Sequence, residues 1–90
     1  MDLRKLQRTI VDALEDVKAH DIRVFDTTKL SDLFDRVIIT TGTSNRQTRA
    51  LAFSVSTSVK EKGGENIKVE LLRRIINDEL KVRMSKNIRR

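Results

Sequence analysis

The stretch Asp35-Arg-Val-Ile-Ile-Thr-Thr-Gly-Thr-Ser-Asn-Arg-Gln47 decides the fold of this chain, because it joins the signals of a strand, a turn and a helix start. The apolar run 37–39 is β-branched, which predicts a strand buried on both faces. Gly42 can take a positive φ, and Ser44 stands three residues before Gln47, which is the spacing of a capping box. We therefore predict a strand over 36–41, a tight turn and a helix that begins at Ser44.

A helix and a strand are predicted on the N-terminal side of this stretch. Asp2 can cap a helix whose apolar positions fall on one stripe, and residues 22–25 alternate as a strand does. The stripe consists of Leu3, Leu6, Ile10, Ala13, Leu14 and Val17. We expect Leu30, Leu33 and Phe34, which precede the central strand, to close one end of the core.

The helix that begins at Ser44 should end at the glycine pair 63–64. Its predicted inward stripe consists of Ala50, Leu51, Ser54, Val55, Ser58 and Val59. Phe53 falls off this stripe, so it either packs under the C-terminal segment, which we favour, or lies in a contact with a partner.

The last third of the chain carries two conflicting periodicities. Val69, Leu72 and the pair 75–76 recur at helical spacing, so a helix fits best. Leu80, Val82 and Met84 alternate with polar residues, which leaves a strand open near the end. A strand over 67–71 would instead make the preceding helix a right-handed crossover and add a third member to the sheet.

Length and composition indicate one small domain without a disulfide framework. The chain has 90 residues, no cysteine and a net charge of +6, and no apolar run approaches the length of a bilayer span. We therefore expect a cytoplasmic protein that does not enter membranes. Residues 1–35 carry six basic and eight acidic side chains, whereas residues 36–60 carry four basic and no acidic ones, an asymmetry that favours an anionic neighbour.

Residues 29–52 resemble the ribosomal silencing factor (Iojap-like) family, whose signature T-G-x-S-x-R-Q occurs at 41–47. The resemblance covers residues 4–66 and then stops. Beyond that point the family has strands with a Trp, an Asp-aromatic-Gly turn and a His-aromatic ending, and none of these motifs is present. Residues 67–90 are similar instead to the helical C-terminal region of the type I restriction endonuclease motor subunit.

Two segments within an α/β fold follow from these resemblances. We predict a small sheet with flanking helices over residues 1–66, truncated relative to the family, and a divergent basic segment, helical in conformation, over residues 67–90.

The first resemblance implies a translational repressor in the cytoplasm. Such a protein binds the large ribosomal subunit at its subunit-joining face, through a ribosomal protein there, and blocks association with the small subunit. Family members often form homodimers, so a homodimer is one state that the resemblance implies. Only the matching motif is carried over residue by residue: Asn45, Arg46 and the nearby Arg49 are expected in partner contacts, and the residues with mainly structural roles are Asp35, Gly42, Thr43, Ser44 and Gln47.

Two other interpretations stay open. The chain could be a truncated or chimeric relic without silencing activity. It could also be a nonspecific RNA-binding module, because the residues after Glu79 include several bases and no acid. Those bases are Lys81, Arg83, Lys86, Arg89 and Arg90.

The sequence offers no catalytic constellation, although the fold of the family is similar to that of nucleotidyltransferases. Catalysis of that kind needs metal-binding carboxylates beyond the glycine-serine turn, and no acid occurs between Asp35 and Glu61. Serines are numerous, but the single histidine, His20, precedes the central strand and no serine has a recognisable elbow motif around it. We therefore expect a binding protein without cofactor or metal, not an enzyme.

Overall fold

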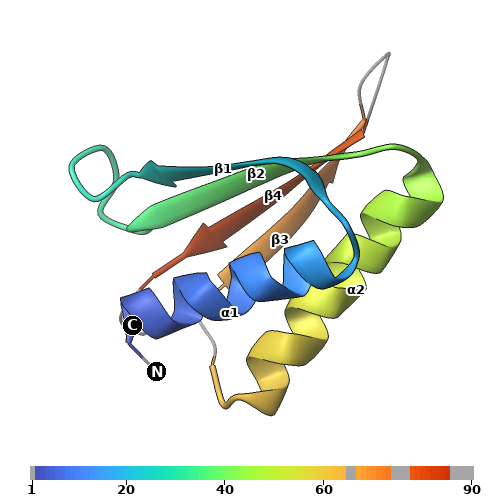
Figure 1. Ribbon diagram of the computed structural model, residues 1–90. Coiled ribbons are helices and arrows are strands. Elements are labelled where there is room, and N and C mark those ends of the chain that lie inside the picture. Colours follow the sequence, from blue (N-terminus) through green and yellow to red (C-terminus); the bar gives the residue numbers. More distant parts are fainter. Residues whose placement is uncertain (1, 65–66, 74–77, 86–90) are drawn as a thin grey trace.

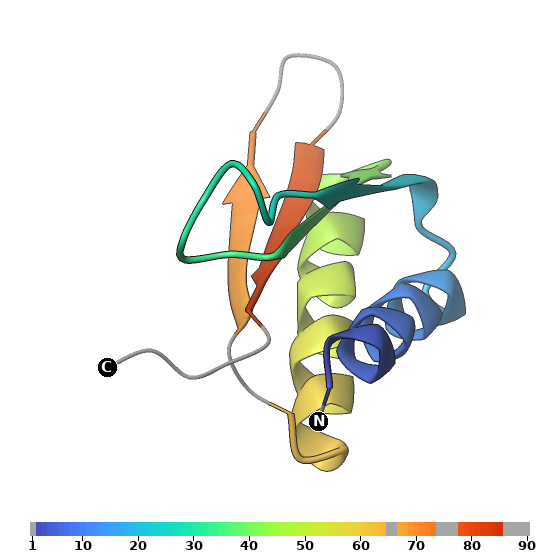
Figure 2. The ribbon, with the colours of Figure 1, turned by 90° about the vertical axis from the view of Figure 1, so that its left-hand side faces the viewer.

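Two helices and four strands make up the computed structural model, which describes residues 2–64, 67–73 and 78–85. In chain order the elements are α1 (Leu3–Asp16), β1 (His20–Asp26), β2 (Arg36–Gly42), α2 (Asn45–Glu61), β3 (Ile67–Leu72) and β4 (Asp78–Met84). The predicted α/β class is confirmed, and both helices lie on the same side of the sheet (Figures 1 and 2).

The sheet is antiparallel throughout, with the strand order β1-β2-β4-β3. Along β2, Ile38 and Thr40 are fully buried beneath the helices, whereas Val37 and Ile39 on the other face stay half-exposed. The prediction that this strand is buried on both faces is therefore wrong, because among the described residues only one face of the sheet is covered by helices.

Helix α1 forms as its apolar stripe predicts. The Asp2 side chain accepts a hydrogen bond from the Lys5 amide at 2.8 Å and so caps the first turn. Leu6, Ile10 and Leu14 of the stripe are buried in the core.

Helix α2 begins after the Ser44 cap and crosses behind the sheet. Leu51, Val55 and Val59 form its buried stripe, as predicted, but Ala50 is exposed because it lies one position off that stripe. The Ser54 hydroxyl donates to the Ala13 carbonyl at 3.0 Å and links the two helices.

The C-terminal prediction of a helix over 67–90 is wrong where the structure describes it, because this segment forms β3 and β4. The alternation of Leu80, Val82 and Met84 decides the conformation, since all three side chains are buried. The alternative of a strand at 67–71 is confirmed, and Ile75 and Ile76 of the helical pattern lie outside the described residues. The boundary at residue 66 stays a prediction, although strands from both sides of it share one sheet.

The loop between β1 and β2 does not close the core. Leu30 is 83% exposed and Leu33 is 60% exposed, so the expectation that they cover one end of the core is wrong. The loop is instead held by polar contacts, including the Thr27 hydroxyl, which donates to the Phe34 carbonyl at 2.9 Å. The Phe34 ring is partly covered by the Arg83 guanidinium, 5.5 Å from the ring centre.

Gly42 is required by close packing, which gives a test of the fold. A Cβ at this position would lie 2.1 Å from the Thr48 hydroxyl oxygen. We expect Gly42→Ala to lower the free energy of unfolding by about 1–3 kcal/mol, measured by urea denaturation. The control Ser56→Ala, on the exposed side of α2, should change it by less than about 0.5 kcal/mol. Equal stability of the two variants would contradict this packing.

Candidate functional site

The turn between β2 and α2 gathers the sequence motif into one hydrogen-bonded unit. The Ser44 hydroxyl accepts from the Gln47 amide at 3.0 Å, as the capping spacing predicts. Gly42 is the last residue of β2, and Gly63 is the one glycine with a positive φ among the described residues, so the left-handed turn expected at Gly42 is wrong. The glycine is needed instead because Thr48 of the first turn of α2 lies against it.

Gln47 uses both ends of its side-chain amide. Its Oε1 accepts from the backbone amide of Thr43 at 2.6 Å and from the Thr43 hydroxyl at 2.9 Å. Its Nε2 donates to the carbonyls of Val17 and Lys18, each at 3.3 Å. One side chain therefore ties the start of α2 to the end of α1, about thirty residues earlier in the chain.

Asp35 anchors the other end of β2. It is 7% exposed, its amide donates to the Met84 carbonyl at 2.7 Å, and its carbonyl accepts from the Thr27 amide at 2.9 Å. These bonds connect β2 to the end of β4 and to the β1–β2 loop. Asp35 therefore lies at the far end of the strand from the turn, so the structure does not bring all the motif residues together.

The three residues predicted to contact a partner differ in their surroundings. Asn45 is half-buried, and its Nδ2 donates to the Asp78 carboxylate at the start of β4, at 3.3 Å. Arg46 and Arg49 are exposed, and neither guanidinium group forms a hydrogen bond or ion pair with another described residue. Asn45 therefore joins α2 to β4, whereas the guanidinium groups of Arg46 and Arg49 are available for contact with a partner.

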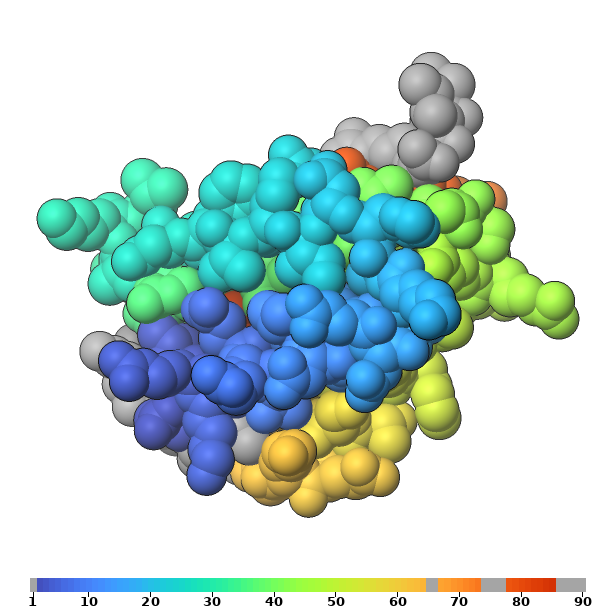
Figure 3. All heavy atoms as spheres, in the orientation of Figure 1, coloured from blue at the N-terminus to red at the C-terminus, as the bar shows by residue number. Residues whose placement is uncertain are grey.

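Phe53 completes an exposed stripe with these two arginines. It is 73% exposed, so the expectation that it packs under the C-terminal segment is wrong for the described residues. Positions 46, 49, 50 and 53 follow helical spacing and share one side of α2. We call Arg46, Arg49, Ala50 and Phe53 the α2 contact face. Side chains of the first half of α2, coloured green, project from the surface in Figure 3.

The spacing of these residues in the sequence indicates this face, although we expected Phe53 to pack under the C-terminal segment. Phe53 stands four residues after Arg49 and seven after Arg46, and each lies off the apolar stripe. A large aromatic residue off the apolar stripe of an amphipathic helix indicates an exposed position.

A concave region lies between α1 and the β1–β2 loop, with a volume of about 500 Å³ and charged groups in its lining. There the Arg36 guanidinium lies 3.2 Å from the Asp26 carboxylate. Hydrogen bonds from Thr28 lower the pKa of Asp26, and Arg36 lowers it further. These opposite charges neutralise one another, so the cleft has no strong preference for an anion or a cation.

No group of three or more His, Cys, Asp or Glu side chains gathers as a metal site would require, within the part of the chain that the structure describes. None of the helices described is long and apolar enough to span a membrane.

Comparison with known proteins connects this geometry to a family. Residues 1–75 match the family model described as ribosomal silencing factor during starvation. The chain belongs to the ribosomal silencing factor family. The match includes the predicted region of resemblance and extends through β3.

Two relatives from Chromobacterium violaceum support the assignment. The chain is 48% identical over 63 residues to a ribosomal silencing factor of that organism, covering 70% of this chain and 52% of the relative. A protein of the same organism with an X-ray crystal structure is 44% identical, with a TM-score of 0.73 over 78% of this chain and 58% of that one. The chain thus spans about half the length of the curated silencing factor that it matches.

The Gln47 bridge between the helices gives a second prediction. Gln47→Ala removes the partners of the Thr43 amide and of two carbonyls at the end of α1. We expect the free energy of unfolding to fall by about 1–2 kcal/mol in urea titration. Arg46→Ala, one position earlier in the same turn, is a matched control and should cost less than about 0.5 kcal/mol. A Gln47→Ala protein as stable as this control would show that the bridge contributes nothing.

Proposed function

We propose that this protein represses translation by binding the large ribosomal subunit at its subunit-joining face and blocking association with the small subunit. The match to the silencing-factor family over residues 1–75 supports this role. A ribosomal protein on that face is the proposed partner, and a ribosomal role places the protein in the cytoplasm. The function is steric, so it requires neither a catalytic group nor a cofactor.

The α2 contact face is the surface that we propose for docking, and its exposed aromatic ring is the observation that carries the proposal. An aromatic side chain that is 73% exposed gains apolar burial when a partner covers it. Phe and Arg are typical of the centres of protein interfaces, where a few such residues supply most of the binding energy. The flanking Arg46 and Arg49 can bind carboxylates or phosphates in the fork geometry of the guanidinium group.

A rigid base holds this face in position. The opposite side of α2 is anchored by the buried residues Leu51 and Val55. Ser44 and Gln47 fix the start of the helix, and Asn45 joins it to Asp78 of β4. Because these contacts preorganise the helix, we assign the motif residues a positioning role and Arg46, Arg49 and Phe53 the contacts themselves.

Co-sedimentation with purified large subunits tests this assignment. We expect the wild-type protein to bind stoichiometrically at moderate salt and to slow subunit joining, followed by light scattering. The double variant Arg46→Glu/Arg49→Glu and the single variant Phe53→Ala should each weaken binding by about tenfold or more. The control Lys60→Glu/Lys62→Glu reverses two exposed charges at the other end of the same helix and should bind nearly as the wild type does.

The remaining interpretations predict different outcomes. A nonspecific basic RNA-binding module would lose affinity steeply as salt rises and would be as sensitive to Lys60→Glu/Lys62→Glu as to the variants of the α2 contact face. The resemblance of the last third to a restriction enzyme would imply a truncated or chimeric relic. Such a relic would fail to bind large subunits, even if a denaturation curve showed that it unfolds cooperatively. Unimpeded subunit joining at saturating protein would contradict the proposed function.

A further inference from the structure

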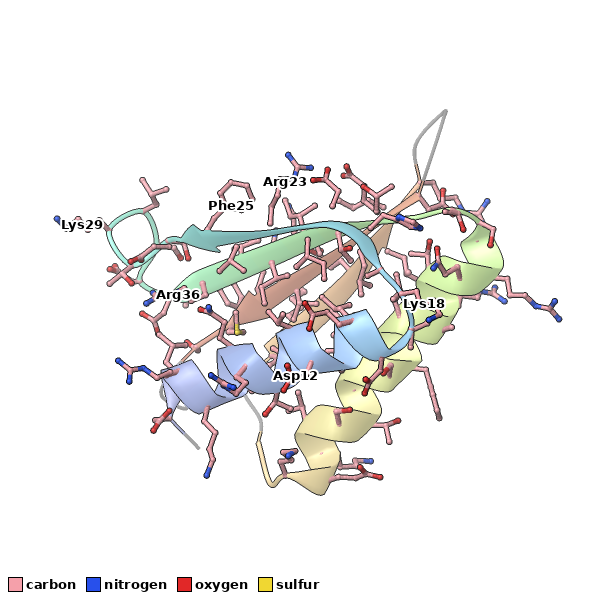
Figure 4. The ribbon with its side chains drawn as sticks, viewed as in Figure 1. Asp12, Lys18, Arg23, Phe25, Lys29 and Arg36 are labelled. Atoms are coloured by element: carbon pink, nitrogen blue, oxygen red, sulfur yellow. The ribbon has the colours of Figure 1, made fainter. Side chains whose placement is uncertain are left out.

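The open face of the sheet, which no described helix covers, has an apolar centre. Val37 and Ile39 of β2 are half-exposed on this face, and their partners in β1 are Phe25 and Arg23. Phe25 is 43% exposed, and it projects with Arg23 away from the helices (Figure 4). An aromatic ring in this position offers a flat apolar surface to a partner.

Basic side chains extend the open face across β4 and β3. Arg83 is opposite Val37 and Lys81 is opposite Ile39, so both bases adjoin the apolar centre. Lys68 of β3 is in turn directly opposite Arg83, which makes two like charges neighbours in one row. Such a pair is unfavourable in the free protein, and a bound anion would relieve the repulsion.

Acidic side chains accompany the two arginines of this face. Glu70 lies 3.4 Å from Arg83, measured between a carboxylate oxygen and a guanidinium nitrogen. Arg23 lies 3.5 Å from Asp21 and 4.0 Å from Glu79, measured in the same way. Because each arginine is already balanced by a carboxylate, the two arginines add little net positive charge to the open face.

The two lysines carry the unbalanced charge of the open face. Lys68 is exposed and Lys81 is half-exposed, and neither ammonium group forms an ion pair with another described residue. An occupant of this face should therefore combine negative charge for the lysines with flat groups that stack on Phe25. We propose that the open face of the sheet binds single-stranded RNA, with bases against Phe25 and phosphates at Lys68 and Lys81.

Unpaired RNA fits these features better than other anionic macromolecules do. Every base has a π-face, so stacking on an exposed aromatic ring does not depend on the base sequence. A duplex keeps its bases stacked inside and presents mainly phosphates, so Phe25 would add little to its binding. An acidic protein segment would neutralise the lysines, but its carboxylates would gain nothing from the ring. A few nucleotides can span the roughly 10–14 Å across the strands between Phe25 and the lysines.

Fluorescence anisotropy with a labelled oligouridylate of about 12 nucleotides, a length within the usual site size, tests the stacking role of Phe25. We expect the wild-type protein to bind with a micromolar dissociation constant. Phe25→Ala should raise this constant about fivefold or more, whereas Phe25→Tyr keeps an aromatic ring and should bind as the wild type does. The control Phe53→Ala removes a more exposed ring from the α2 contact face and should change the constant by less than about twofold.

Charge removal tests the role of the two lysines. Lys68→Gln/Lys81→Gln should weaken binding about fivefold or more at low salt, and should reduce the slope of log affinity against log salt concentration by about one. The matched control Arg46→Gln/Arg49→Gln removes two charges from the α2 contact face and should change neither quantity appreciably. Thermal unfolding establishes that each variant is folded. If Phe25→Ala does not fold, the comparison of Phe25→Leu with Phe25→Tyr decides the result.

A wild-type protein that does not bind the oligouridylate at high micromolar concentration would overturn the inference. Folded Phe25→Ala protein that binds as tightly as the wild type would overturn it too. Equal losses from the lysine pair and the arginine pair would also contradict it, because they would indicate binding by overall charge alone.

Competition experiments separate RNA from the other anionic partners. Unlabelled oligouridylate should displace the probe much better than duplex RNA of the same length or a polyglutamate peptide does, and equal displacement by either competitor would overturn the inference. The inference does not rest on the proposed ribosomal role, because the probe is free RNA. Failure of RNA binding and failure of ribosome binding are thus separate results.

Discussion

The pairing of β2 with β4 is the constraint on which the rest of this fold depends. These two central strands bring Ile38 opposite Val82 and Thr40 opposite Leu80, and all four side chains are fully buried. Both helices pack on this inner surface, so the core is a single layer between one sheet face and two helices. Each of the outer strands, β1 and β3, pairs with only one of the central strands within the described chain.

The elements that could be predicted from the sequence are those with short-range signals. The Asp2 cap, the stripe of α1, the Ser44 cap and the strand before it each depend on residues within a few positions of one another. The C-terminal strands could not be predicted in this way, because residues 69–76 follow a helical period while residues 80–84 alternate. The strand conformation of β4 depends on its pairing with β2, about forty residues earlier, and no local sequence pattern predicts that pairing.

The candidate site was predictable in part, for a similar reason. The hydrogen bond between Ser44 and the Gln47 amide follows from spacing alone. The reach of the Gln47 side chain to the end of α1, and the close approach of Thr48 to Gly42, depend on how α2 lies against the rest of the chain. The apolar run 37–39 misled the burial prediction, because its continuous hydrophobicity resembles a strand covered on both sides.

The open face of the sheet also bears on how a partner is recognised. Phe25 and Arg23 project from β1 on the side away from the helices (Figure 4), and the outward positions of β4 are Glu79, Lys81 and Arg83. The inner positions of β4 carry the buried apolar side chains that the core needs, whereas its outward positions set the character of the open surface. The outward side chains of β4 are charged, so Phe25 of β1 supplies the exposed aromatic surface on this face. The α2 contact face, which we propose for docking, lies inside the matched region and combines an exposed aromatic ring with two arginines.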